Sequence, residues 1–462
     1  MNVEELEKKI LSFSTTYFFS DVHKDRDEYY SLPLKDFASN PICMVGYILN
    51  LFIDGELDKA NAILATLPED NIFRIGLTLA NPTVTWKEFI HIINQLKRNN
   101  RPINNVVLTA GRPYLLNGFN DFTRIGPLLA HHKDLFIEDV SFLYGTECTS
   151  SLYNLCLAEY YYQQNRVMDS ELLVSRTIKE FDKKDEFRFL FAALFLEAKN
   201  ALAMGTIVKP AEYIADIKRR VTEVGKAEFS MNINACEVHL SLYSGNYDII
   251  TSWLAGEAPD EAGDFNMLDL YRYMIKIRCY IVQEELSAAV ALIEKLRPLL
   301  ERGKRHIDLC ELDLLLAETL YAAGKTEEAF EPLARALKGA RRRKYYRLVA
   351  DEGAALFELL LAYAERTPDE PGLPRFTENT RRMAIMYPLY LKPRYKNNQQ
   401  FSQMEVEMLN LLQQGKTLEN IGTYFFISVN TVKYHLKKIY TKLNAANSNQ
   451  AVWNARLLGL IK

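Results

Sequence analysis

The sequence of 462 residues lacks any pair of cysteines spaced as a metal knuckle or a redox motif, although it contains six. It also lacks a long apolar run. The longest, near residues 44–53, is interrupted by Asn50 and falls short of the roughly 18 to 20 residues that cross a bilayer. The amino terminus MNVEELEKKILSF is too charged for a secretion signal. We therefore expect buried thiols in a reducing compartment, a cytoplasmic location and no membrane contact.

No set of side chains has the spacing of a catalytic or metal site. His131 and His132 lack further ligands at metal-site spacing. The Gly-Lys-Thr tripeptides at 324–326 and 415–417 lack the upstream glycine of a phosphate-binding loop, and both read as turns between helices. The sequence thus predicts no metal, no cofactor, no ATP binding and no enzymatic activity.

The chain has little net charge, because its 56 basic and 59 acidic residues nearly cancel to a formal charge of −3. The charge is nevertheless unevenly distributed along the sequence. Residues 401–462 hold seven basic and three acidic side chains, a balance of +4 that leaves −7 for residues 1–400. A small basic segment after a larger acidic body predicts that the carboxyl-terminal part meets a polyanion.

Helical periodicity dominates the chain, since apolar residues recur every three to four positions. Two helical stretches of apolar residues meet at the hexad Gly324–Ala329. This pattern is typical of a helix, a tight turn and a second helix, because glycine can end the first helix in a left-handed conformation. Related hexads begin at Asn165, Gly205, Gly245 and Glu284, at intervals of 39 or 40 residues. Paired helices with this period predict an all-α fold built as an α-solenoid of TPR-like pairs. An irregular helical domain with chance spacing remains the alternative.

A solenoid offers a long concave surface that suits a peptide, a small molecule or a second copy of the chain. We expect the first helix of each pair to line it. Tyr160, Tyr243 and Tyr321 lie on those helices and are candidates for a ligand groove. For the run Tyr160–Tyr162, packing in the core is the competing interpretation.

Prolines gather between residues 367 and 400. They are Pro368, Pro371, Pro374, Pro388 and Pro393. Because proline breaks helices, this segment is predicted to be a linker with one helix near 378–386. The expected parts are an amino-terminal helical region (1–145), a helical repeat domain (146–366), the proline-rich linker (367–400) and a small domain (401–462). Within the first part, turn-forming residues predict loops and short helices over 104–134.

Four short helices are predicted in the small domain, over residues 403–413, 417–424, 429–443 and 449–458. Ser428 is a suitable amino-terminal cap for the third helix. One face of that helix is apolar and carries Val432, Leu436, Ile439 and Leu443. A short helix, a tight turn and a longer basic helix form a helix-turn-helix arrangement.

The opposite face of the third helix is polar and basic. It carries Asn430, Lys433, Tyr434, Lys437, Lys438 and Thr441. A helix fits the DNA major groove, where amide, hydroxyl and ammonium groups reach base edges and phosphates together. A lysine-rich face alone is more often a solvated surface. Its combination with the local charge of +4 and the Ser428 cap favours double-stranded DNA as the partner.

These residues also resemble those of a known family. The stretches that look like the LuxR-type DNA-binding domain cover essentially all of 401–462. They are Phe401–Leu409, Ile427-Ser428, Thr431–Leu436, Ile439-Tyr440, Lys442-Leu443, Ala451-Val452 and Ala455-Arg456. The resemblance implies that the third helix enters the major groove and that the fourth, near Val452, contributes to dimer contacts on DNA. It also implies that Glu405 and His435 mainly hold the domain together.

Two features of the body also resemble a known group: repeats near 40 residues followed by Asp351–Gly353 and a leucine-rich helix, and the motifs Thr109–Pro113 and Asn117–Phe119. They look like those of the bacterial MalT-like large regulators, which usually begin with an ATP-binding domain that this sequence does not show. The two resemblances together imply a transcription regulator that binds DNA as a homodimer. RNA polymerase and an unidentified small-molecule or peptide inducer are further partners that they imply. A second interpretation is a TPR-like interaction scaffold whose last domain no longer binds specific DNA. It stays open because Asn420 and Ser448 differ from the residues common in the family, as Gly422 does too. The departures at Asn420 and Ser448 are the ones that support it.

Overall fold

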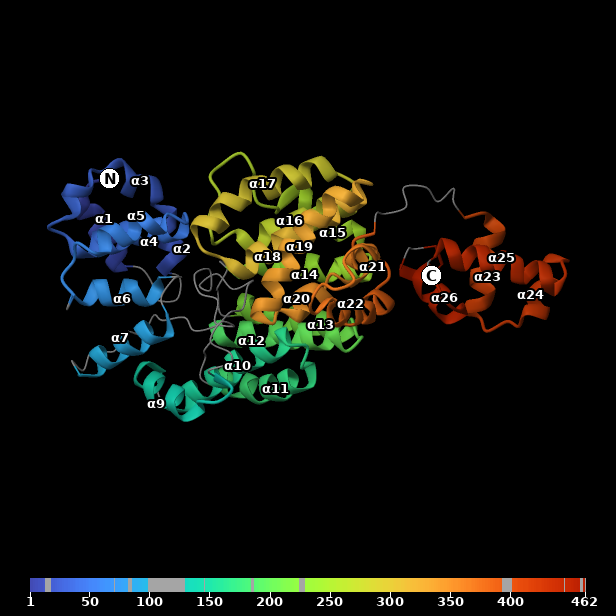
Figure 1. Cartoon of the computed structure of the whole chain (residues 1–462), viewed down its shortest axis with the longest axis horizontal. Helices are drawn as coiled ribbons and strands as arrows, with labels where there is room; N and C mark the ends of the chain where they lie inside the picture. The colour runs from blue at the N-terminus through green and yellow to red at the C-terminus, as the bar shows by residue number, and fades with distance from the viewer. Residues whose placement is uncertain are drawn as a thin grey trace.

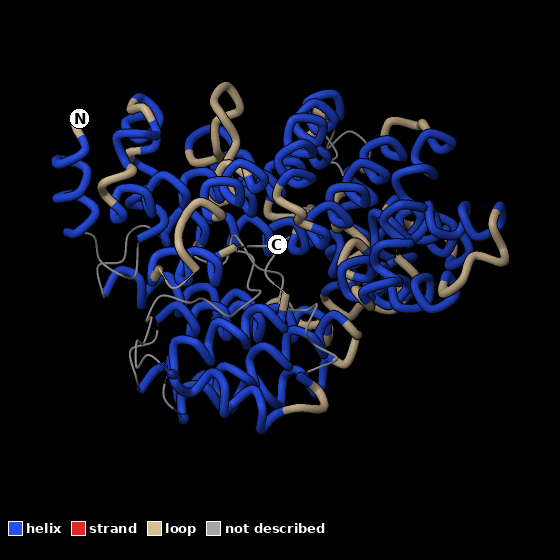
Figure 2. Tube along the Cα trace, turned by 60° about the vertical axis from the view of Figure 1, so that its left-hand side comes forward, coloured by secondary structure: helices blue, strands red, loops and turns tan. Residues whose placement is uncertain are grey.

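The computed structural model describes residues 1–12, 18–69, 71–81, 85–98, 129–144, 146–183, 187–223, 229–392, 401–443, 445–457 and 460–461. Within these ranges every regular element is a helix and none is a strand (Figures 1 and 2). The prediction of an all-α fold is therefore confirmed. The loops predicted over 104–134 fall largely outside the described residues, which resume at Leu129.

The amino-terminal part is organised around one almost fully buried helix. Its elements are α1 (Val3–Ser12), α2 (Phe18–Lys24), α3 (Arg26–Ser31), η1 (Leu34–Phe37), α4 (Pro41–Ile53), α5 (Leu57–Leu64), α6 (Ile72–Ala80), α7 (Trp86–Arg98) and α9 (Lys133–Tyr144). Helix α4 is apolar on nearly all sides because α1, α2, α3, α5 and α6 all pack against it. Asn50, the polar interruption in α4, is buried and donates its amide N–H to the carbonyl of Gly46 at 3.0 Å.

Helical hairpins follow one another through the middle of the chain. They comprise α10 (Thr146–Gln163), α11 (Val167–Lys183), α12 (Phe187–Ala203), α13 (Val208–Glu223), α14 (Ser230–Ser244), α15 (Tyr247–Gly256), α16 (Leu270–Val282), α17 (Leu286–Arg302), α18 (His306–Ala322) and α19 (Thr326–Arg343). Three further helices complete this part: α20 (Tyr346–Ala350), α21 (Gly353–Arg366) and α22 (Leu373–Met386).

The turns between paired helices repeat one backbone conformation. The first residue of every predicted hexad has a positive φ: 62° at Asn165, 95° at Gly205, 70° at Gly245, 61° at Glu284 and 77° at Gly324. Two of these positions carry side chains and still adopt the left-handed conformation, which glycine reaches most readily. The same left-handed residue therefore ends the first helix of each pair whether or not it is glycine. The predicted helix pairs are confirmed.

Residues 373–391 differ from the predicted linker. Helix α22 packs against α20 and α21 and buries Leu373 and Phe376, and all five residues of Tyr387–Leu391 are buried as well. Pro374 lies in the first turn of α22, where its missing N–H breaks no helical bond, and Pro388 follows the end of that helix. These prolines mark the ends of a packed helix, so the linker interpretation is wrong for this segment.

The last four helices pack around a hydrophobic core of their own. They are α23 (Gln403–Gln413), α24 (Leu418–Phe425), α25 (Val429–Lys442) and α26 (Ser448–Leu457) (Figure 1). Their bounds agree with the four predicted helices to within one residue at each end. The small four-helix domain is thereby confirmed as predicted.

Two expectations from composition can be compared with the structure. All six cysteines are buried free thiols. Across the described ranges, every helix is too short or too polar to cross a bilayer.

Candidate nucleic-acid interface

Side-chain caps determine where the helices of the small domain begin. In a capping box at α23, the Ser402 hydroxyl accepts the N–H of Glu405 and the Glu405 carboxylate accepts the N–H of Ser402. Thr417 and Asn420 form the same reciprocal pair at α24. Asn420 therefore retains the function of a capping acceptor. Ser428 caps α25 by accepting a backbone N–H at 3.2 Å, as predicted.

The turn between α24 and α25 is unusually close. A Cβ atom at Gly422 would lie 2.9 Å from the carbonyl oxygen of Ile427, nearer than a real Cβ approaches. Phe426 occupies the turn with a φ of 56° and is 95% exposed. The absence of a side chain at Gly422 thus lets the backbone of the turn pass directly over α24 and fixes the start of α25.

Helix α25 has one buried face and one exposed face. Val432, Leu436 and Ile439 are buried in the domain core. The six residues predicted to contact DNA are all exposed. They are Asn430, Lys433, Tyr434, Lys437, Lys438 and Thr441. The structure thus brings the predicted residues together on one surface, which we call the α25 face.

The charged side chains of the α25 face are all basic, and the carboxylates that interact with them through space, Glu419 and Glu405, lie on the neighbouring helices α24 and α23. Helix α25 contains four lysines and no acidic residue. Within the described part of the chain, no carboxylate pairs with Lys433, Lys437 or Lys438. The Lys438 ammonium lies 4.6 Å from the centroid of the Tyr434 ring, and Tyr434 is 56% exposed. These charges are therefore available to an anionic partner.

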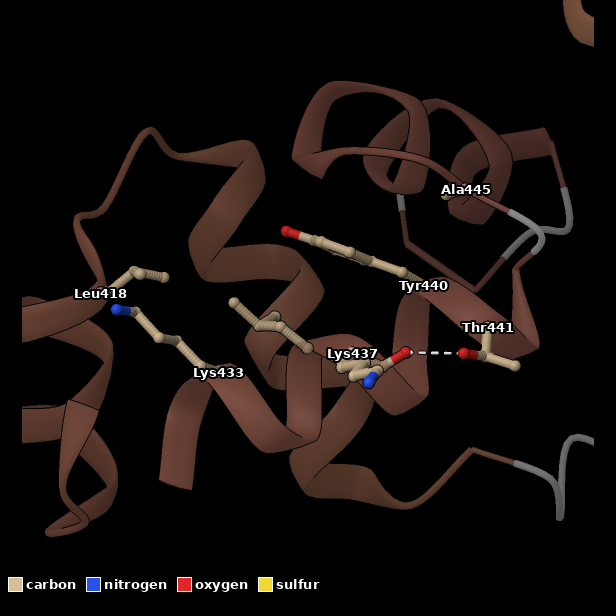
Figure 3. Close-up of a pocket in the computed structure, with 7 residues that line it drawn as sticks. Leu418, Lys433, Lys437, Tyr440, Thr441 and Ala445 are labelled. Carbon is tan, nitrogen blue, oxygen red and sulfur yellow. Dashed lines mark hydrogen bonds between the residues drawn. The ribbon is translucent and has the colours of Figure 1, made fainter. Parts of the chain in front are cut away.

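A groove of about 560 Å³ runs along α25 between the start of α24 and the turn before α26 (Figure 3). It is lined by Leu418, Lys433, Leu436, Lys437, Tyr440, Thr441 and Ala445. The ammonium group of Lys433 extends toward Leu418, and the Thr441 hydroxyl donates to the carbonyl of Lys437 at 2.9 Å (Figure 3). The groove gives this surface a concave strip bordered by lysines.

Sequence analysis missed three residues of this groove, Leu418, Tyr440 and Ala445, and assigned a fourth, Leu436, to the core. Ala445 lies beyond the end of α25. Tyr440 lies three and seven positions after Lys437 and Lys433, a helical spacing that could have identified it. Leu418 comes from the neighbouring helix α24, so no pattern within α25 indicates it.

The fourth lysine of α25 has a structural partner. Lys442 Nζ lies 2.8 and 2.7 Å from the carboxylate oxygens Oε1 and Oε2 of Glu405. Burial raises the pKa of Glu405, but hydrogen bonds from Lys442 and Ser402 outweigh it, and the net pKa lies below the ordinary value. Glu405 therefore ties α23 to α25, as the resemblance implied. His435 is half-buried beside Tyr434, with the ring centroids 5.6 Å apart.

The predicted ligand groove is not formed by the three tyrosines. Tyr160 and Tyr243 are buried, and only Tyr321 is partly exposed, with its hydroxyl 3.3 Å from the Glu358 carboxylate. The reason at Tyr243 is specific, because its ring stacks on Tyr390 from the segment that was predicted to be a linker. The prediction that Tyr160 and Tyr243 line an open groove is therefore wrong.

The predicted absence of a metal site can be examined at the histidine pair. His131 and His132 are both exposed in the turn before α9. In the ranges that the structure covers, no group of three His, Cys, Asp or Glu side chains could hold a metal ion.

Two segments of the chain match models of known families. Residues 146–366 match the MalT-like TPR region. Residues 399–455 match the bacterial regulatory proteins of the luxR family.

Curated relatives resemble a short part of the chain. The transcriptional activator protein PhzR of Pseudomonas fluorescens is 37% identical over 67 residues, which are 14% of this chain and 28% of that protein. The regulatory protein SdiA of Escherichia coli (strain K12) is 41% identical over 61 residues, 13% of this chain and 25% of that protein. The chain thus spans about a quarter of the length of each relative.

Proposed function

We propose that this chain, in which a MalT-like TPR region precedes a LuxR-type helix-turn-helix domain, is a transcription regulator that binds double-stranded DNA through the α25 face. The observation that carries the proposal is the exposure of Lys433, Lys437 and Lys438 on one face of a capped helix, where none of the three forms an ion pair with a carboxylate among the described residues. Ammonium groups arranged along a helix neutralise phosphates and release their counterions.

Five of the six residues of the α25 face are suited by their chemistry to phosphates, to base edges or to both, and the sixth, Thr441, donates its hydroxyl to the carbonyl of Lys437. Lys437 and Lys438 are suited to phosphates, which position the domain without reading sequence. Asn430 and Tyr434 offer groups that can read base edges, and Lys433 borders the groove from which it can reach either. Specificity would therefore come mainly from the first half of α25, and affinity from the second half.

Homodimer formation on DNA is part of the proposal. Helix α26 presents Trp453, which is 51% exposed, next to half-buried Val452. An exposed indole on a small domain is a suitable contact for a second copy. Sequence analysis pointed to Val452 but not to Trp453.

The body would act as a sensor and assembly unit in the cytoplasm, where a regulator meets DNA and RNA polymerase. We propose that an unidentified small-molecule or peptide inducer changes how two bodies associate. Association of two bodies raises the effective concentration of the second DNA-binding domain.

For the domain boundaries, we retain 1–145, 146–366 and 401–462 as predicted. We assign residues 367–392 to the repeat domain, because they pack against it.

Selection of duplex DNA from a random library by the full chain tests DNA recognition. The expected result is enrichment of one sequence, lost in the Lys433→Ala, Tyr434→Ala, Lys437→Ala triple variant. Failure to enrich any sequence would favour the scaffold interpretation, in which the last domain binds protein only.

A chain that starts at residue 395 tests the role of the body, because the small domain has a core of its own. The full chain should bind paired sites about tenfold or more tightly than this domain. Equal affinity would show that the body does not assemble the DNA-binding domains.

A further inference from the structure

Residues Tyr387–Leu391, which we call the strap, lie across the first helices of successive hairpins. The strap follows α22 directly, and the Tyr387 hydroxyl donates to the carbonyl of Leu202 at the end of α12, at 3.1 Å. The ring of Tyr390 stacks on Tyr243 of α14, with 4.2 Å between centroids. The strap thereby covers a surface formed by α12, α14 and α16.

The anchor of the strap is a buried ionic cluster. The Tyr390 hydroxyl donates to Glu352 Oε2 at 2.6 Å and accepts a bond from Arg278 Nε of α16 at 3.0 Å. Arg278 also pairs with Glu311 of α18 at 2.8 Å and with Glu352. All four side chains are buried, so the strap is held by polar contacts in a region from which water is excluded.

The cluster contains more acid than base. Glu318 of α18 is 2% exposed, and neither of its carboxylate oxygens has a hydrogen-bond partner among the described residues. Burial and the nearby charge of Glu352 raise its pKa well above the ordinary value, which favours the neutral form. A buried carboxyl group without a partner destabilises the packing around the cluster.

A second unfavourable feature lies at the end of the strap. Leu391 has a φ of 54°, in the left-handed region where a residue with a Cβ atom is strained. Its side chain is nevertheless buried, so packing holds the strained backbone in place. The strap thus combines specific anchors with a backbone strain at Leu391 that its release would remove.

We propose that the surface formed by α12, α14 and α16 is a binding site for a tyrosine-bearing segment, which the strap of the same chain occupies and can leave while the helices beneath stay folded. Release replaces the hydrogen bonds of the Tyr387 and Tyr390 hydroxyls by bonds to water, and it relieves the backbone strain at Leu391. Tyr387, Tyr390 and Leu391 belong to the same buried apolar cluster as residues of α14, α16, α17 and α18, so release gives up these contacts while the contacts among the helices are kept. The proposal is independent of DNA binding.

Native-state hydrogen exchange of the full chain at low guanidinium concentrations tests it. The amides of Tyr390 and Lys392 donate to the carbonyls of Tyr387 and Leu389 at 3.0 and 3.1 Å, so their exchange reports strap opening. We expect them to exchange faster than the amides of α16 and α18, with little dependence on denaturant.

A Tyr390→Phe variant should accelerate strap exchange about tenfold or more while leaving the amides of α17 unchanged. The matched control is Tyr273→Phe, which removes a buried hydroxyl bonded to the carbonyl of Asp260 at 2.6 Å, on the same helix as Arg278 but away from the strap. This control should leave strap exchange at the wild-type rate. Where Tyr390→Phe does not fold, Tyr387→Phe, which loses only the bond to Leu202, should still accelerate the strap severalfold.

Strap amides that exchange with the same free energy and denaturant slope as α16 and α18 would overturn the proposal. The strap would then open only when the whole repeat domain unfolds. Equal acceleration by Tyr273→Phe and Tyr390→Phe would overturn it as well, since the ionic anchor would have no specific role.

Discussion

Lys442 and Glu405 join the end of α25 to the start of α23, with the Lys442 ammonium 2.7 Å from one carboxylate oxygen and 2.8 Å from the other. The same carboxylate accepts the N–H of Ser402 at 2.8 Å. One buried acid therefore caps a helix and positions the helix that we propose enters DNA. Lys442 thus differs in role from the exposed lysines of α25.

Removal of this acid should destabilise the small domain. Glu405→Ala loses both the reciprocal cap and the partner of Lys442, and we expect a loss of about 2 kcal/mol. Hydrogen exchange of α23 and α25 amides in the full chain measures it. The control is Gln403→Ala, which changes an exposed residue of the same helical turn. Equal protection in both variants would contradict the role of Glu405.

Low pH should lower the stability of the small domain by protonating Glu405. Because the pKa of Glu405 is lowered by folding, the unfolded state binds its proton more readily. The stabilisation is therefore complete above the unfolded pKa of about 4.3 and is lost as pH falls through the lower folded value. Exchange of α23 amides between about pH 3 and 6 should show a smaller acid dependence in Glu405→Gln than in wild type. The same dependence in both would count against this assignment.

The boundaries of the small domain could be predicted because their determinants are local. Ser402, Thr417 and Ser428 cap helices within three residues of themselves, and the apolar spacing of α25 marks its buried face. The exposure of the α25 face follows from the same periodicity. Its contact with DNA stays a prediction.

The strap could not be predicted because its burial depends on distant residues. Tyr390 is buried by Tyr243 and Arg278, which lie more than a hundred positions away. Nearby prolines and polar residues are typical of a linker, and no local pattern indicates such partners. The same contact explains why Tyr243 does not line a groove.

Substitutions on the α25 face should separate affinity from specificity. Lys437→Ala should weaken binding to all sequences similarly and lower the salt slope by about one. Lys433→Ala and Tyr434→Ala should each relax sequence preference by about 1–3 kcal/mol. Fluorescence anisotropy over a salt series measures both effects.

Lys416→Ala provides the matched control for these variants, because Lys416 is an exposed lysine outside α25. It should change affinity less than Lys437→Ala. Wild-type affinity in the Lys433, Tyr434, Lys437 triple variant, or binding without salt dependence, would rule out the α25 face as the DNA-contacting surface.

A close approach between α21 and α22 predicts a sensitive glycine in the body. A Cβ atom at Gly353 would lie 2.6 Å from the Ala384 nitrogen and 2.6 Å from Met383 Cβ. Gly353→Ala should therefore force the two helices apart and cost about 1–3 kcal/mol. Scanning calorimetry can compare it with Gly256→Ala, where the new methyl group meets no atom within 4 Å. Equal melting temperatures would contradict close packing at this site.

The buried strap also limits how far each small domain can travel from its body. A linker over 367–400 would provide a tether of 34 residues, whereas with Lys392 held in place only eight residues, 393–400, precede Phe401. Eight residues of any conformation span at most about 30 Å. Neighbouring sites one DNA turn apart are separated by about 34–36 Å. Freeing the strap adds roughly 20 Å to the reach of each domain, so the operator spacings that the protein tolerates should widen when the strap leaves its surface.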